Sequence, residues 1–216
     1  VVIPAFAVGR TQEILYYIRE LESERSIPVL PVIIDSPMAY YTTKHYIRAK
    51  ADHDEETREL IRRHINPLET ASFHFVGKRG ATGTDPAIVI SASGMATGGR
   101  VLNHLKACLP DPNSTVVFVG FQAEGTRGRR LLDGDKEVKI HGEMVPVRAK
   151  ITYISNLSAH ADYEETLYWL SHFRRPPKRL FITHGEVEAA EAQRKRVIEK
   201  FGWETAIPDY LDSYDL

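Results

Sequence analysis

Residues 87–110, AIVISASGMATGGRVLNHLKACLP, contain the pattern that decides the fold. A short apolar run at 87–91 has the length of a strand, and it leads into a loop of small residues at 91–100. The loop is followed by a helical stripe of apolar residues over 101–109, which Pro110 ends. Because the next apolar run follows at 115–120, the segment predicts a strand, a crossover helix and a second, parallel strand.

The same alternation continues on the N-terminal side of this segment. Apolar runs at 1–6, 28–34 and 72–76 predict strands, and helical periodicity covers 54–65. Ser36 and Pro37 are suited to the cap and the first position of another helix. After Gly9 the sequence predicts a helix with one apolar face, formed by Ile14, Leu15, Ile18 and Leu21. The fold class is therefore α/β, with a Rossmann-like and mainly parallel sheet.

The pattern changes near residue 125. Residues 126–130 are basic, and 137–154 predict antiparallel strands broken around Gly142. Helix and strand then resume over 163–173, 179–183 and 187–201, with Gly202 as a C-terminal stop. We place a domain boundary near residue 150. The remaining segment is short for an independent core, so we expect it to complete a sheet whose other strands lie outside this chain.

Composition excludes several classes of protein. The chain has 216 residues, 43% of them hydrophobic and 26% charged, with a formal net charge of −1, so disorder is disfavoured. No apolar run approaches the roughly 20 residues of a membrane-spanning helix. The single cysteine, Cys108, excludes a disulfide framework and favours the cytoplasm. The near-zero net charge neither supports nor excludes nucleic acid as a partner.

Two histidines are the main candidates for chemistry. His184 follows a predicted strand and precedes Gly185, in the position where α/β sheets gather ligands and metals. A metal ligand and a helix-capping or hydrogen-bonded histidine are both open there. His160 precedes Asp162, which with Glu165 fits a helix capping box. A proton donor, a phosphate contact and an ordinary surface histidine are open for His160.

Two segments are candidates for phosphate binding. The small-residue loop at 91–100 lacks the dinucleotide-binding spacing, and it suits either a phosphate cradle or a tight crossover. The basic run at 126–130 suits phosphate pairing or a solvated turn. The other histidines considered have no ligand spacing and are interpreted as structural: His45, His53, His64, His74, His104 and His141.

Taken in order, these segments resemble the β-CASP branch of the metallo-β-lactamase superfamily, which processes nucleic acids. The resemblance is greatest to prokaryotic homologues of the endonuclease subunit of the cleavage and polyadenylation specificity factor. RNase J and repair nucleases of the Artemis type are more distant. The matching segments are residues 4–13, 35–39, 91–100, 125–134, 157–162 and 183–186.

The resemblance implies domains and roles. Residues 1–150 would be the β-CASP domain, and 151–216 the C-terminal segment of an αββα metallo-β-lactamase domain. His160 matches the motif B histidine, which helps to protonate the leaving oxygen. His184 matches the motif C histidine, a ligand of one of two zinc ions. The residues that would line the RNA cleft or bind phosphate are Ser91, Ser93, Gly94, Arg127, Arg129 and Ser158.

The resemblance implies a zinc-dependent RNA phosphodiester hydrolase that serves in RNA processing or degradation. The implied partner is RNA, single-stranded RNA in particular. The H-x-H-x-D-H signature that supplies most zinc ligands is absent, and one histidine cannot hold a two-zinc site. We therefore expect this chain to be the half that needs an N-terminal metallo-β-lactamase partner and is inactive alone. A homodimer is also allowed. The alternatives are a non-catalytic module that binds RNA or a partner nuclease, and a DNA-directed repair nuclease.

Overall fold

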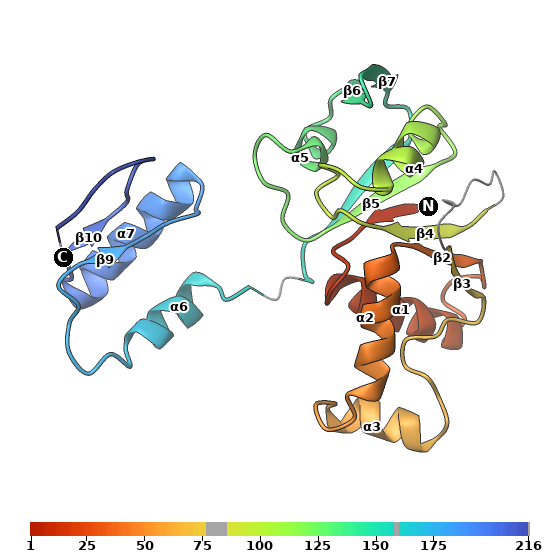
Figure 1. The fold of residues 1–216 in the computed structure, drawn as a ribbon, viewed down its shortest axis with the longest axis horizontal. Coiled ribbons are helices and arrows are strands. Elements are labelled where there is room, and N and C mark those ends of the chain that lie inside the picture. The colour runs from red at the N-terminus through yellow and green to blue at the C-terminus, as the bar shows by residue number, and fades with distance from the viewer. Residues whose placement is uncertain (77–85, 158–159, 216) are drawn as a thin grey trace. The chain divides into compact units, whose positions relative to one another are not determined.

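The computed structural model describes residues 1–76, 86–157 and 160–215, which form two compact units, Val1–Ser158 and Ala159–Leu216. The first unit is built on one parallel sheet with the strand order β3-β2-β4-β1-β5-β8 (Figure 1). The predicted α/β class with a mainly parallel sheet is confirmed. Its strands are β1 (Val2–Pro4), β2 (Val32–Asp35), β3 (Phe73–Phe75), β4 (Ile88–Ser91), β5 (Thr115–Val119) and β8 (Lys150–Ile154).

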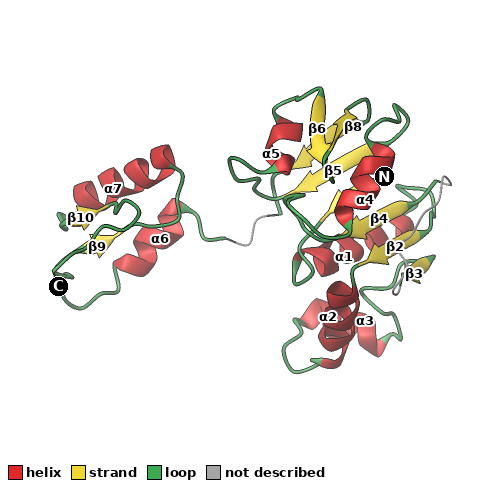
Figure 2. Cartoon of the chain, turned by 45° about the horizontal axis from the view of Figure 1, so that its top comes forward, coloured by secondary structure: helices red, strands yellow, loops and turns green. Residues whose placement is uncertain are grey.

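Helices cover both faces of this sheet (Figure 2). On one face lie α1 (Arg10–Ser23) and α2 (Pro37–Arg48), with α3 (Glu55–Arg62) following α2 along the chain. On the other lie α4 (Val101–Cys108) and α5 (Arg127–Leu132). Ser36 caps α2 as predicted, because its Oγ accepts from the amide of Ala39 at 3.2 Å.

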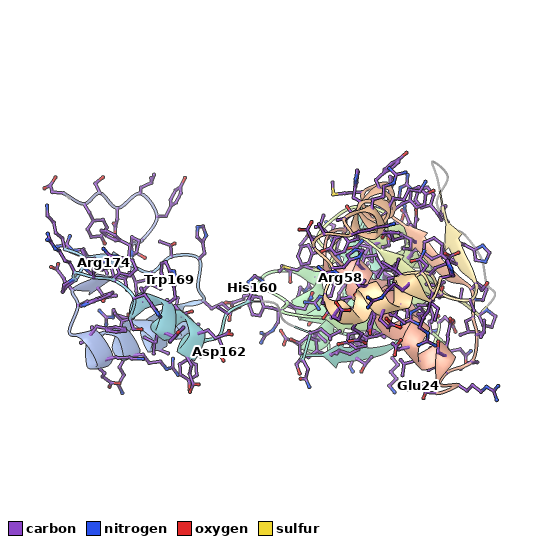
Figure 3. All side chains as sticks on the ribbon, turned by 90° about the horizontal axis from the view of Figure 1, so that it is seen from below. Glu24, Arg58, His160, Asp162, Trp169 and Arg174 are labelled. Carbon is purple, nitrogen blue, oxygen red and sulfur yellow. The ribbon has the colours of Figure 1, made fainter. Side chains whose placement is uncertain are left out.

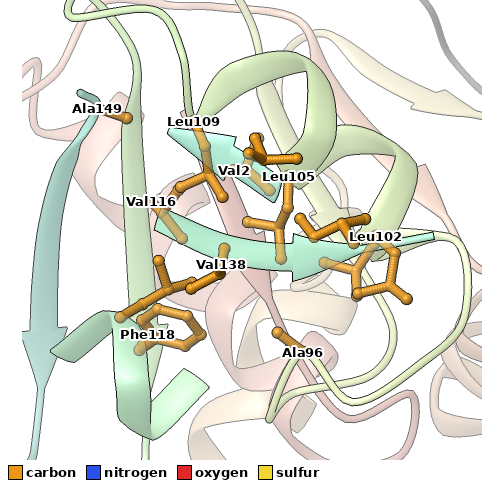
Figure 4. Packing of buried hydrophobic residues seen from close by; sticks show 13 residues of the cluster. Val2, Ala96, Leu102, Leu105, Leu109, Val116, Phe118, Val138 and Ala149 are labelled. Carbon is orange, nitrogen blue, oxygen red and sulfur yellow. The ribbon is translucent and has the colours of Figure 1, made fainter. Parts of the chain in front are cut away.

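Two hydrophobic cores result, one against each face of the sheet. Successive strand residues point to opposite faces, so Val2 belongs to the core under α4 and Ile3 to the core under α1. In the first core, Leu105 of α4 packs with Phe118 of β5 and Val138, all fully buried (Figure 4). The unit therefore has the three layers expected of a doubly wound sheet.

The segment predicted as antiparallel strands divides into two parts. The hairpin of β6 (Glu137–Ile140) and β7 (Glu143–Pro146) is antiparallel, and it turns at His141 and Gly142, both with positive φ. The prediction was wrong for β8, which pairs with β5 in parallel register and extends the main sheet. Local periodicity predicts a strand at this position, but long-range packing selects the strand it pairs with.

Strand β2 is shorter than the predicted 28–34. It begins at Val32, directly after Pro31. A proline has no amide hydrogen to donate to a sheet, so it stands outside the strand while its carbonyl still accepts from Ile88 at 2.9 Å.

The second unit is small. It contains α6 (Tyr163–Leu170), β9 (Leu180–Phe181), α7 (Val187–Phe201) and β10 (Thr205–Ala206), with β9 and β10 paired in parallel. Helix α7 has the predicted bounds and ends at Gly202, which has the left-handed conformation with φ of 65°. The buried core of this second unit, within the described residues, consists of Leu167, Leu170 and Val197. None of the helices described, in either unit, has the length and apolar character to cross a bilayer.

Candidate nucleic-acid interface

The carboxyl edge of the six-stranded sheet holds a topological switch point. Strands β1 and β4 are neighbours, but the chain leaves β1 for α1 on one face and leaves β4 for α4 on the other. In open α/β sheets, ligands bind outside the carboxyl ends of strands where the connections diverge in this way. Of the predicted cleft residues, Ser91 ends β4 at this point, and Ser93 and Gly94 follow it.

The loop at 91–100 forms a tight turn. Gly99 has φ of 77°, and a Cβ there would lie 2.6 Å from the carbonyl oxygen of Ala92. The Oγ of Ser93 accepts from the amide of Thr97 at 3.2 Å. Ser93 is partly exposed, whereas Gly94 is buried. The loop is thus a tight crossover that presents a hydroxyl at the sheet edge, and its use as a phosphate cradle stays a prediction.

Ser91 lies beneath this edge and contacts a buried ionic network. Its Oγ donates to the carbonyl oxygen of Asp35 at 3.0 Å. The Asp35 carboxylate is 1% exposed, and it accepts from Arg100 Nη1 at 2.7 Å and from His104 Nε2 at 2.8 Å. Ser91 itself is buried, so any role in ligand binding is indirect in this conformation.

Sequence reasoning missed this network, although it interpreted His104 correctly as structural. The available signal was an acidic residue, Asp35, directly after a buried strand at the carboxyl edge. A buried carboxylate requires hydrogen-bonding or charged partners, and here they come from the start of α4.

Arg127 links the loop at 91–100 to the β6–β7 hairpin through hydrogen bonds. Its Nε donates to the carbonyl oxygen of Lys139 at 2.8 Å, and its Nη1 donates to that of Ala96. Burial, and secondarily the charge of Arg130, lowers the pKa of Arg127. The structure thus brings Arg127 together with the predicted loop residues, through contacts to backbone carbonyls.

The other arginines of the basic run pair with nearby acids. The run begins α5, which Thr126 caps, and is not an isolated turn. Arg129 Nε donates to both carboxylate oxygens of Asp133 at 2.9 and 3.0 Å, and Arg130 Nε donates to Asp135 at 2.7 Å. These ion pairs reduce the local positive charge, and they direct Arg129 along its own helix.

A buried glutamine joins the loops that follow β4 and β5. Gln122 Nε2 donates to the carbonyl oxygens of Gly94, Gly120 and Phe121, at 3.2, 3.3 and 3.1 Å. A Cβ at Gly128 would lie 1.8 Å from Gln122 Oε1, so only glycine fits beside this side chain without a shift. No composition or spacing signal singled out Gln122.

His160 and Asp162 lie at the start of α6 in the second unit (Figure 3). The capping box predicted for Asp162 is confirmed: its Oδ1 accepts from the Glu165 amide at 2.8 Å, and its own amide donates to Glu165 Oε2 at 3.0 Å. His160 is exposed and lies two residues before the cap residue Asp162. Ser158 lies outside the described residues.

His184 lies between β9 and α7, in the predicted position after a strand. It is exposed, and its φ of 65° is left-handed. An imidazole there can act as a zinc ligand, but within residues 1–76, 86–157 and 160–215 no group of three or more His, Cys, Asp or Glu could hold a metal. The described donors therefore do not complete a zinc site.

Comparison with known families gives two consecutive matches. Residues 11–131 match the Beta-Casp domain, and residues 144–208 match the Zn-dependent metallo-hydrolase RNA specificity domain. The first match runs from within α1 to within α5, and it includes the loop at 91–100. The second covers β8 and the elements that carry His160 and His184.

Curated relatives agree with these matches. The transcription termination factor FttA of Methanosarcina mazei is 30% identical over 225 residues, covering 100% of this chain and 35% of the relative. A ribonuclease of Thermus thermophilus is 36% identical over 193 residues, covering 87% of this chain and 43% of the relative. An RNase J-like protein of Methanocaldococcus jannaschii is 33% identical over 191 residues, covering 86% and 43%. The chain thus spans well under half the length of these relatives.

Proposed function

The chain belongs to the β-CASP family of the metallo-β-lactamase superfamily, and on that premise we propose that it serves a zinc-dependent ribonuclease that processes or degrades RNA. The observation that carries the proposal is the consecutive match to a Beta-Casp domain and to a Zn-dependent metallo-hydrolase RNA specificity domain. Relatives that are named ribonuclease and RNase J-like protein support hydrolysis of RNA.

We assign RNA binding to the carboxyl edge of the first unit. Ser93 offers a hydroxyl at the surface, while Ser91 and Gly94 shape the loop from below. Arg127 and Arg129 are cationic groups of the matching segment 125–134, and guanidinium groups bind phosphate through charge-assisted hydrogen bonds. Ser158 completes the set assigned from the resemblance. Residues 1–150 would then be the β-CASP domain.

We assign the chemistry to residues 151–216, as part of the metallo-β-lactamase domain. His160 would protonate the leaving oxygen, and its exposed position before α6 leaves it accessible to a substrate. His184 would supply one zinc ligand in the full-length protein, where the remaining ligands would come from a metallo-β-lactamase segment. Zinc, if bound, supplies charge stabilisation and an activated water. We place the protein in the cytoplasm and expect the chain alone not to cleave RNA.

Three variants of the full-length gene product test this assignment. His184→Ala should lower bound zinc and abolish RNA cleavage. His160→Ala should retain zinc and lower cleavage by about 10²–10⁴-fold, the usual contribution of a general acid or base. His172→Ala is the matched control, because His172 is exposed and its ring bonds locally, to the carbonyl oxygen of Tyr168 near the end of α6, at 2.9 Å.

The readouts are zinc content by mass spectrometry and cleavage of matched single-stranded RNA and DNA. Unchanged cleavage by His184→Ala would contradict the metal assignment. Faster cleavage of DNA than of RNA would favour the repair-nuclease alternative. Salt-dependent RNA binding with neither zinc nor cleavage in the full-length protein would favour a non-catalytic module.

A further inference from the structure

Two aromatic side chains are exposed at the carboxyl edge of the sheet. Phe6, after β1, is 51% exposed, and Phe121, after β5, is 54% exposed. Both hydrophobic cores of this unit are filled without them. Both rings are therefore accessible to a ligand at this edge.

Strand register places these residues close together. Val2 of β1 pairs with Val89 of β4 on one side and with Val116 of β5 on the other. The register with β4 ends at Pro4 and Ser91, and beyond it Phe6 lies against Gly94, where a Cβ would be 3.2 Å from the Phe6 amide nitrogen. Phe6 and Phe121 therefore follow neighbouring parallel strands at the switch point, and the loop at 91–100 follows the strand on the other side of β1.

Phe6 is held in a fixed position. Its carbonyl oxygen accepts from the amide and the Oγ of Thr11, at 3.2 and 2.8 Å. Its ring packs on Gly94: a Cβ at Gly94 would lie 3.1 Å from Cδ2 and 3.2 Å from Cε2 of the ring. A side chain at position 94 would crowd the ring of Phe6, which explains why a glycine follows Ser93.

Phe121 is fixed to the same loop. Gln122, the next residue, donates to the carbonyl oxygens of both Phe121 and Gly94. Both aromatic residues therefore extend from backbone that is already ordered, so binding a ligand there costs little conformational entropy. The partly exposed hydroxyl of Ser93 and the exposed hydroxyl of Thr97 lie on the same loop.

We propose that Phe6 and Phe121 form a base-stacking platform for single-stranded RNA. Gly94 is a positioning residue, because the ring of Phe6 packs against it. This inference rests on the proposed function. Unstacked bases of single strands bind by stacking on aromatic rings, and adjacent hydroxyls suit the sugar and phosphate. The mixture of exposed rings and hydroxyls at a switch point favours a nucleic-acid strand over an apolar protein surface.

The test measures binding of the 216-residue chain to a decauridylate RNA with one 2-aminopurine, and to the same RNA with an abasic residue instead. Phe6→Leu keeps apolar volume and removes the ring, so it should weaken binding of the 2-aminopurine RNA by about 5- to 100-fold per lost stack. Fluorescence quenching of 2-aminopurine should also be lost. The dependence of affinity on salt should stay unchanged, because phosphate contacts remain.

Two further variants sharpen the test. Gly94→Ala should reproduce part of the loss, because its Cβ displaces the ring of Phe6. Tyr17→Leu is the matched control, since Tyr17 is 46% exposed but lies on α1, and it should bind as the wild type does. The platform is overturned if Phe6→Leu binds as tightly as the wild type, or if it weakens binding of abasic RNA equally. Absence of RNA binding by the wild-type chain would overturn the platform and the proposed RNA interface together.

Discussion

The two units of this chain differ in how much of their apolar surface they bury. Among its described residues, the first has one core of 13 buried residues and another of 12, one on each face of its sheet. The core of the second unit, Ala159–Leu216, has 3 buried residues within the described range 160–215. Meanwhile the second unit leaves large side chains such as Tyr168, Trp169 and Tyr210 exposed, at 67%, 62% and 92%.

This difference separates two ways of holding a functional residue. In the first unit, Ser93 and Phe6 extend from loops that are fixed by buried hydrogen bonds and packed cores. In the second, His160 and His184 are exposed on short connections beside a small core. A core of that size supplies only a few kcal/mol, so the second unit should open more readily than the first.

Unfolding experiments can follow the two units separately, because both tryptophans, Trp169 and Trp203, lie in the second. Asp35→Ala should give the largest effect, about 3–5 kcal/mol off the stability of the first unit, since it removes the buried partner of Arg100 and His104. The change should lower the unfolding midpoint seen by circular dichroism of the sheet. Tryptophan fluorescence should keep its own midpoint.

The control for this prediction is Asp133→Ala. Asp133 also pairs with an arginine, Arg129, but both side chains are exposed, so the cost should be below about 1 kcal/mol. If Asp35→Ala shifts the fluorescence and circular dichroism transitions equally, the two units unfold as one and the comparison fails.

The sequence predicted features that depend on neighbouring residues. Helix 187–201 was found with its predicted bounds, and the capping box of Asp162 was confirmed, because both are determined within one or two helical turns. The network of Asp35 was not predictable, since its partners Arg100 and His104 lie 65 and 69 residues away. The prediction that β8 is an antiparallel strand was wrong for the same reason, because its partner β5 lies far away in the sequence. Which residues meet across the sheet depends on packing that single-sequence periodicity does not contain.

A second prediction uses the pH dependence of the first unit. Burial raises the pKa of the Cys108 thiol to about 11, from an ordinary value near 9.0. Below pH 9 the thiol is protonated in both states, and stability is at its full value. Between about pH 9 and 11 the thiol ionises only in the unfolded chain, so the free energy of unfolding should fall by about 2–3 kcal/mol.

The measurement is urea unfolding of the wild type and of Cys108→Ala at pH 8 and pH 11.5, followed by circular dichroism. Tyrosines and lysines also titrate in this range, so the quantity compared is the difference in pH dependence between the two proteins. Cys108→Ala should lose less stability than the wild type on going to high pH. Equal losses would show that the thiol is no less exposed in the folded state.

The smallest effect is expected in the second unit, from Asp162→Ala. The substitution removes the acceptor of the Glu165 amide at the start of α6, which should cost about 1 kcal/mol. Because the total stability of this unit is small, even this loss should visibly lower the midpoint of tryptophan fluorescence, whereas circular dichroism of the main sheet should not respond. Asp162→Asn serves as the control, since asparagine caps helices about as well. A shift in the sheet transition instead would mean that the cap stabilises the first unit, and that the two regions are not energetically separate.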